Sequence, residues 1–146
     1  ATFRCARHHE PQRQLHGEPV HIEDGLPTEI KPYIIQNGKE VYKFATKILP
    51  MATRMACQKI DLPISDIDFF IPHQANIRII ETACKNLDST MDKFIVNIAE
   101  HGNTSSATIP IAFDEAIRSG KIKRGDKICF VGFGAGLTYG AVVIEY

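Results

Sequence analysis

Hydrophobic and polar residues follow one another along the chain in spacings that predict helices and strands in turn. Apolar residues recur every three to four positions over Lys39–Lys59, which predicts an amphipathic helix with a kink at Pro50. Ile77–Asn86 shows the same spacing, and so does a third stretch that starts at position 104 or 105, runs to about Arg118 and stops at Gly120. Three helices are therefore expected.

Short apolar runs between these helices predict strands, because they are rich in β-branched and aromatic residues. The expected strands are Ile67–Ile71, Phe94–Ile98, Lys127–Phe133 and Thr138–Tyr146. A short turn, Gly134-Ala135-Gly136, joins the last two, which should form an antiparallel hairpin. Alternating helices and strands predict a layered α/β domain whose mixed sheet is covered by helices and ends in that hairpin.

The first 30 residues lack this regularity. They carry four of the six histidines and three of the eight prolines. No apolar spacing is sustained there, and the one strand-like run is Val20–Ile22. We therefore expect an irregular N-terminal segment over 1–30 and an ordered domain over 31–146.

Charge and hydrophobicity exclude two classes of partner. Seventeen basic and seventeen acidic residues cancel, so the chain lacks the electrostatic pattern of a protein that binds nucleic acid or an anionic membrane. The longest apolar runs fall far short of the roughly 20 residues that span a bilayer. The first ten residues also lack the apolar core of a secretory signal. We expect no nucleic-acid or membrane partner.

The cysteines predict reduced thiols in a cytoplasmic protein. Two of them fall on expected helices and one in an expected strand, and the four lie far apart at Cys5, Cys57, Cys84 and Cys129. The last three are interpreted as small core residues. A zinc site built from Cys5 and four histidines (His8, His9, His16, His21) is the alternative, but it offers one thiol and no second Cys-x-x-Cys. No metal site is expected.

Two polar turns carry the candidate chemistry. His73-Gln74-Ala75-Asn76 follows Pro72 at the end of an expected strand, and Gly102-Asn103-Thr104-Ser105 precedes an expected helix that Thr104 or Ser105 would cap. Such junctions expose polar side chains in α/β domains, where a histidine and an asparagine can both donate to one carbonyl oxygen. The structural alternatives remain open: a satisfied histidine, and a turn asparagine that tolerates positive φ.

A third motif, Gly132-Phe133-Gly134-Ala135-Gly136, is not a dinucleotide-binding loop. The required spacing would place a glycine at Leu137, and the run leads into a strand rather than a helix. Its expected use is to let backbone N–H groups approach a ligand closely, as an oxyanion hole requires.

These motifs together resemble the C-terminal half of the beta-ketoacyl-acyl-carrier-protein synthase III family, which are condensing enzymes with a thiolase-like fold. Four stretches carry the resemblance in the same order: 37–45, Pro72–Asn76, Gly102–Ser105 and 132–138. The resemblance covers about Lys31 to Tyr146. It implies a thiolase-like layered half and a function in starting fatty acid biosynthesis.

The resemblance also implies roles for particular residues. In the family, a cysteine of the N-terminal half takes an acyl group from acyl-CoA, and malonyl-acyl carrier protein is decarboxylated and condensed onto it. His73 and Asn103 match the residues that hold the malonyl thioester carbonyl. Phe133 matches a phenylalanine beside the reactive centre, and the backbone of Gly134, Ala135 and Gly136 matches the loop that supplies an oxyanion donor.

Further matches concern binding. Ala75 and Asn76 correspond to the channel for the pantetheine arm of coenzyme A, and Arg78 to a basic residue that docks the acidic acyl carrier protein. The resemblance implies no cofactor beyond coenzyme A and phosphopantetheine thioesters as substrates, and a homodimer for the full enzyme.

The chain departs from the family in three ways. None of its cysteines has the sequence context of the family's nucleophile, and residues 1–30 do not resemble the opening of the family's second half. Ser106 and Tyr139 also replace the family's more usual alanine and tryptophan. Three hypotheses follow. The chain is an acyltransferase half that needs a nucleophile-bearing N-terminal half and is inactive alone. Alternatively it is a non-catalytic module that binds coenzyme A or the carrier protein. The third possibility is an inactive truncated remnant.

Overall fold

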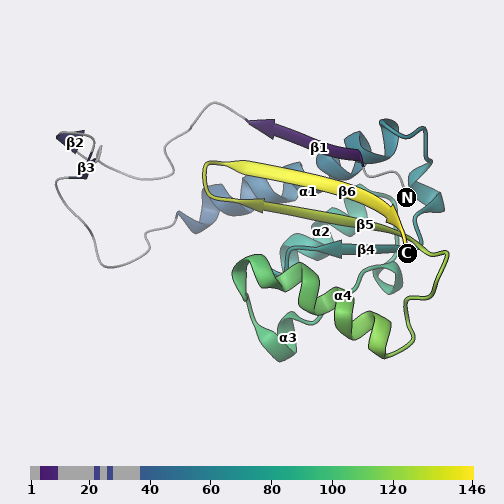
Figure 1. The fold of residues 1–146 in the computed structure, drawn as a ribbon. Helices are drawn as coiled ribbons and strands as arrows, with labels where there is room; N and C mark the ends of the chain where they lie inside the picture. Colours follow the sequence, from purple (N-terminus) through teal and green to yellow (C-terminus); the bar gives the residue numbers. More distant parts are fainter. Residues whose placement is uncertain (1–3, 10–21, 24–25, 28–36) are drawn as a thin grey trace.

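The computed structural model describes residues 4–9, 22–23, 26–27 and 37–146 of the chain (Figure 1). Its helices are α1 (Gly38–Gln58), α2 (Ile77–Asn86), α3 (Ile98–His101) and α4 (Thr108–Arg118). Its strands are β1 (Arg4–His9), β2 (Ile22–Glu23), β3 (Leu26–Pro27), β4 (Phe69–Pro72), β5 (Lys127–Gly134) and β6 (Thr138–Glu145). From α1 onward the elements follow the predicted order except at Phe94–Ile98, where a strand was expected.

A mixed sheet forms the centre of the molecule, with strand order β1-β6-β5-β4. β4 pairs with β5 in parallel, while β6 pairs antiparallel with both β5 and β1. The expected hairpin is confirmed, with Gly134 opposite Thr138 at its closed end. The remaining pair, β2 with β3, is a separate two-stranded ribbon.

Helices cover both faces of this sheet. Successive residues of a strand point to opposite sides, so a strand with apolar residues at neighbouring positions presents an apolar surface on each face. Cys129 and Val131 of β5 join one buried cluster with residues of α1 and α2, whereas Ile128 joins a second cluster with Ala112 and Ala116 of α4. Figure 1 shows α4 on one side of the strands and α1 on the other. The layered α/β prediction is therefore confirmed.

The long helix α1 continues through Pro50 as a single helix. A proline has no N–H, so the carbonyl of Thr46 lacks its usual helical partner. Asn86, at the end of α2, donates to that carbonyl through Nδ2 at 3.4 Å. The hydrogen bond ties α1 to α2 at the proline.

Three expectations from the sequence are corrected. The range Phe94–Ile98 is not a strand: only Phe94 makes an isolated parallel bridge to Phe70, and Ile98 already begins α3. Phe94 and Ile95 are buried beside the sheet, and the N–H of Ile95 donates to the carbonyl of Phe70 in β4 at 2.9 Å. Burial of this kind produces the same sequence signal as a strand.

The second correction concerns the start of α4. Neither Thr104 nor Ser105 caps it: the helix begins at Thr108 after a short 3₁₀ turn, Ser105–Ala107, and has no side-chain cap. The last correction is limited to 4–9, because the rest of the segment expected to be irregular over 1–30 lies outside the described residues apart from 22–23 and 26–27. Arg4–His9 instead forms β1 and pairs with β6 in a six-residue register, from Arg4 opposite Val143 to His9 opposite Thr138. An edge strand can be recruited by an existing hydrogen-bonding edge without a strong pattern of its own.

Candidate active site

His73 follows the last residue of β4, in a turn that a buried neighbour holds in place. Its backbone N–H continues the hydrogen-bond ladder to β5 at 2.8 Å. Gln74 is fully buried, and its Nε2 donates to the carbonyls of Pro72 and Ile95 at 2.8 and 3.1 Å. Its Oε1 accepts from the N–H of Asn97 at 3.3 Å. The turn that presents His73 is thus fixed from inside the protein.

Asn103 lies in the exposed loop between α3 and α4. The preceding Gly102 has φ +66° and ψ −158°, a conformation that is essentially restricted to glycine. Asn103 Oδ1 accepts a hydrogen bond from the N–H of Ser105 at 3.0 Å. Because the oxygen of the carboxamide is engaged, its Nδ2 is the donor that remains for a ligand.

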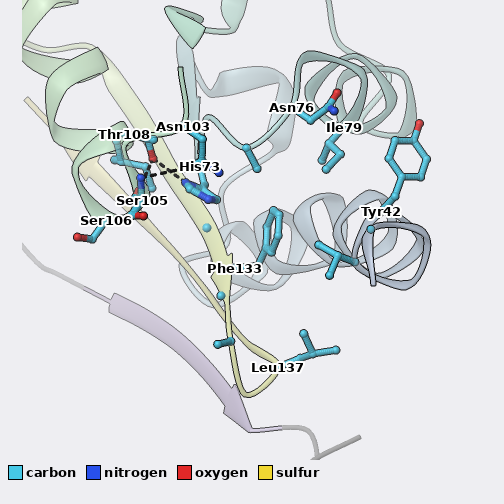
Figure 2. A pocket seen from close by; sticks show the side chains of 17 residues that line it. Tyr42, His73, Asn76, Ile79, Asn103, Ser105, Ser106, Thr108, Phe133 and Leu137 are labelled. Carbon is cyan, nitrogen blue, oxygen red and sulfur yellow. Dashed lines mark hydrogen bonds between the residues drawn. The ribbon is translucent and has the colours of Figure 1, made fainter. Parts of the chain in front are cut away.

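Thr108, the first residue of α4, connects the two turns. Its side chain is buried, and its Oγ1 lies 2.6 Å from His73 Nδ1 and 2.9 Å from the carbonyl oxygen of Ser105. Hydrogen bonds therefore run from His73 through Thr108 and Ser105 to Asn103 (Figure 2).

A single cavity of about 790 Å³ gathers most of the sequence-predicted site residues. Figure 2 shows the imidazole of His73 and the ring of Phe133 within it, with Asn103 on the α4 side and Asn76 on the α2 side. The lining comprises Gly38, Val41, Tyr42, His73, Ala75, Asn76, Ile79, Asn103, Ser105, Ser106, Thr108, Ile109, Gly132, Phe133, Gly134, Ala135 and Leu137. His73 and Asn103 therefore both line this cavity, and their shared contact with one carbonyl oxygen stays a prediction.

Aromatic rings shield one side of His73. The Phe133 ring lies edge-to-face with the imidazole, with centroids 5.4 Å apart, and packs in turn against Phe44 at 6.2 Å. Burial lowers the pKa of His73 below its ordinary value, because removing water disfavours the charged form. The imidazole is therefore neutral at neutral pH.

The predicted binding residues divide between the cavity and the surface around it. Ala75 and Asn76 line the cavity, and Asn76 Oδ1 caps α2 by accepting from the N–H of Arg78 at 2.9 Å. Arg78 is exposed and lies outside the lining, as does Gly136, which has φ +130° at the hairpin turn. The proposed carrier-protein contact and the cavity are thus on neighbouring but separate surfaces.

The cysteines of the described core are confirmed as buried, free thiols. Burial raises the pKa of Cys57, of Cys84 and, to about 12, of Cys129. A thiol is nucleophilic only as the thiolate, so these groups are inert at neutral pH. None of the described residues that line the cavity is a cysteine.

Several cavity residues were not anticipated from the sequence. Gly38, Val41 and Tyr42 come from the first turns of α1, which belonged to a recognised motif but had no assigned role. Thr108 is the most consequential omission. Its partner His73 lies 35 residues earlier in the chain, and no short-range spacing marks such a contact.

The described residues show neither a metal site nor a membrane-spanning helix. Among the described residues, no group of three or more histidine, cysteine, aspartate or glutamate side chains is arranged to hold a metal ion. The side chains of the alternative zinc site, Cys5, His8, His9, His16 and His21, lie outside those described. Within the described part of the chain, no helix combines the length and apolar character of a membrane span.

Comparisons with known proteins agree with the fold and the motifs. Residues 57–146 match the family model described as 3-oxoacyl-[acyl-carrier-protein (ACP)] synthase III C terminal. A beta-ketoacyl-[acyl-carrier-protein] synthase III of Clostridium acetobutylicum is 51% identical over 128 residues, which cover 88% of this chain and 38% of that protein. The chain thus spans well under half the length of this curated relative.

Solved structures show the same relationship. A beta-ketoacyl-[acyl-carrier-protein] synthase III from Thermus thermophilus superimposes with a TM-score of 0.82 at 38% identity, covering 99% of this chain and 45% of that one. A 3-oxoacyl-[acyl-carrier-protein] synthase III from Aquifex aeolicus gives a TM-score of 0.76 at 43% identity, over 78% of this chain and 37% of that one. The fold is therefore thiolase-like, and the chain belongs to the family of 3-oxoacyl-[acyl-carrier-protein] synthase III, whose C-terminal part it matches.

Proposed function

We propose that this chain supplies the part of an acyl-condensing enzyme that binds and decarboxylates a malonyl thioester, the initiating condensation of fatty acid biosynthesis. The observation that carries the proposal is the placement of His73 and Asn103 on one cavity, beside Phe133 and the Gly134–Ala135 backbone. Its substrates would be acyl-CoA and malonyl-acyl carrier protein.

Chemistry explains why this pair of side chains suits decarboxylation. When the bond between the malonyl carboxylate and the α-carbon breaks, CO₂ leaves. The electron pair of that bond stays with the α-carbon and delocalises onto the thioester oxygen, which forms an enolate. Two N–H donors aimed at that oxygen, from His73 Nε2 and Asn103 Nδ2, stabilise the developing charge more than the ground state. Removing one such donor typically costs about 10²–10³ in rate.

The surroundings of the pair strengthen these interactions. Phe133 and its neighbour Phe44 exclude water from one side of His73, which raises the strength of each charge–dipole interaction. The exposed backbone of Gly134 and Ala135 allows a second acyl group to approach closely, and its N–H groups can serve as an oxyanion donor.

The proposal includes a partner, because the described cavity holds no cysteine nucleophile. A nucleophile-bearing half, supplied as another chain or as more of the same chain, would complete the condensation after decarboxylation. The complete assembly would be a homodimer, and the isolated chain would be inactive in condensation.

The test combines the chain with a cysteine-bearing half of the same family and measures CO₂ release from malonyl-acyl carrier protein. We expect a clear gain in rate over the cysteine-bearing half alone, and loss of that gain in His73→Ala. A mixture that is no faster than the cysteine-bearing half alone, while the chain gives a cooperative melt, would falsify the proposal.

The second candidate is a module that binds coenzyme A or carrier protein without catalysis. The observation that favours it is the extension of the cavity to Gly38, Tyr42 and Asn76 at the first turns of α1 and α2, with exposed Arg78 beside it. Titration of the chain with pantetheinylated carrier protein tests this. Affinity that is unchanged in Arg78→Ala would contradict a carrier-protein contact at α2.

A further inference from the structure

Thr108 lies beside two groups that can accept the proton of its hydroxyl group, His73 Nδ1 and the carbonyl oxygen of Ser105. A threonine hydroxyl has a single proton. It can donate to His73 Nδ1 at 2.6 Å or to the carbonyl oxygen of Ser105 at 2.9 Å, but not to both. The choice decides which ring nitrogen of a neutral His73 carries the imidazole proton.

The two choices have opposite consequences for the cavity. If Thr108 donates to Nδ1, that nitrogen is unprotonated and Nε2 carries the proton as a donor. If Thr108 donates to Ser105 instead, its oxygen accepts the proton of Nδ1, and Nε2 is left with a lone pair. Only the first arrangement gives the N–H donor that a thioester oxygen needs.

One observation favours donation to His73. The carbonyl oxygen of Ser105 already accepts the backbone N–H of Thr108, so it is satisfied without the hydroxyl. Among the described residues, Thr108 Oγ1 is the hydrogen-bond partner of His73 Nδ1, so an unprotonated Nδ1 depends on this hydroxyl for a donor.

Burial makes the choice persistent. Thr108 is 2% exposed, so water cannot replace either partner of its hydroxyl group. Its backbone is fixed as the first residue of α4, and Ala112 one turn later is fully buried against the sheet. The hydroxyl is therefore held beside the ring rather than brought there when substrate binds.

We propose that Thr108 is a positioning residue that donates its hydroxyl proton to His73 Nδ1 and thereby holds the imidazole as the Nε2–H tautomer. The same residue spans the two turns, because its backbone N–H donates to the carbonyl of Ser105, and Ser105 donates its own N–H to Asn103 Oδ1. Thr108 thus fixes the donor identity of one carbonyl-binding group and the location of the other. This proposal rests on the proposed function for its catalytic consequence, but not for its structural content.

The first test is ¹⁵N NMR of the full chain labelled at histidine nitrogens, at a pH where His73 is neutral. His73→Gln identifies the signals of His73. We expect Nε2 to give the signal of a protonated ring nitrogen and Nδ1 that of an unprotonated one. A protonated Nδ1 in the wild-type chain overturns the proposal, whatever the chain's activity.

The second test uses two substitutions that separate the hydroxyl from the shape of the side chain. Thr108→Val keeps the volume and removes the hydroxyl, whereas Thr108→Ser keeps the hydroxyl. With the cysteine-bearing half present, we expect Thr108→Val to lower kcat for decarboxylation about tenfold with little change in KM, and Thr108→Ser to stay within about twofold of wild type. An unchanged kcat in Thr108→Val overturns the proposal.

The outcomes also separate this proposal from the proposed function. If His73→Ala leaves decarboxylation unchanged, the proposed function fails, but the NMR result still decides the tautomer. If Thr108→Val does not give a cooperative melt, the wild-type spectrum and the activity of Thr108→Ser decide instead. A protonated His73 Nδ1 in Thr108→Ser counts against the proposal.

Discussion

The His73 turn and the Asn103 loop contribute to one cavity but are built in opposite ways. The His73 turn is held from within, by a fully buried Gln74 that bonds to Pro72, Ile95 and Asn97. The Asn103 loop is exposed from 101 to 106 and is held by local hydrogen bonds between neighbouring residues. The core of the protein thus positions one of the two proposed donors, and the backbone conformation of a surface loop positions the other.

This difference predicts which substitutions disturb each of the two proposed donors. A change beneath His73 should disturb both stability and activity, because the same hydrogen bonds serve the core and the site. A change within the Asn103 loop should disturb the site with a smaller effect on the core. Thr108 contacts both His73 and Ser105, and so joins the His73 turn to the Asn103 loop.

The largest expected effect tests whether both turns serve one oxygen atom. His73→Ala and Asn103→Ala should each lower decarboxylation by about 10²–10³, measured with the cysteine-bearing half present. Because both donors act on the same charge, the double variant should lose less than the product of the single losses. Fully multiplicative losses would show that the two side chains act at separate places.

The matched comparison for that experiment is stability. Asn103 is exposed, so Asn103→Ala should change the free energy of unfolding by less than about 0.5 kcal/mol. Denaturant unfolding of the isolated variant measures this value. A larger loss would mean that the loop is part of the folding core after all.

The next effect tests the internal support of His73. Gln74→Leu keeps a similar volume but removes three hydrogen bonds, and it leaves the N–H of Asn97 facing an apolar side chain. We expect a loss of about 2–3 kcal/mol in the free energy of unfolding, together with reduced decarboxylation. Urea unfolding followed by circular dichroism measures it, and a loss below about 0.5 kcal/mol would contradict the internal clamp.

A smaller effect tests the backbone of the Asn103 loop. Gly102 has φ +66° and ψ −158°, and an added Cβ would meet no atom within 4 Å, so strain rather than a clash opposes Gly102→Ala. We expect a loss of about 1–2 kcal/mol in stability, with weaker decarboxylation as Asn103 shifts. Gly38→Ala is the control, because that position also has open space but opens helix α1 with ordinary φ. Equal effects at both positions would show that the conformation of Gly102 is not required.

The sequence predicts the parts of this site that local pattern determines. Strand and helix periodicity places His73 at the end of β4, and the glycines mark the β5–β6 turn. Sequence pattern fails in two places. At Phe94–Ile98 the apolar residues resemble a strand but only Phe94 forms a bridge, and Arg4–His9 pairs as a strand although its sequence has no strand pattern. The contact of Thr108 with His73 depends on how α4 packs against the sheet, which no spacing within either motif encodes.

The smallest effect tests the buried setting of His73 through pH. Burial lowers the pKa of His73 in the folded chain below the unfolded value of about 6.5, so the unfolded state binds its proton first on acidification. Above that value both states are neutral and His73 contributes nothing; as pH falls below it, protonation favours unfolding. Between about pH 7.5 and pH 5.5, the wild-type chain should therefore lose more stability than His73→Gln, whereas Asn103→Ala should follow the wild type, since its loop loses no titrating group. Thermal melts of the three chains at both pH values measure the difference. If His73→Gln loses as much stability as the wild type, the imidazole is not held in a desolvated site, and the contrast between an internally built donor and a surface-built one fails at His73.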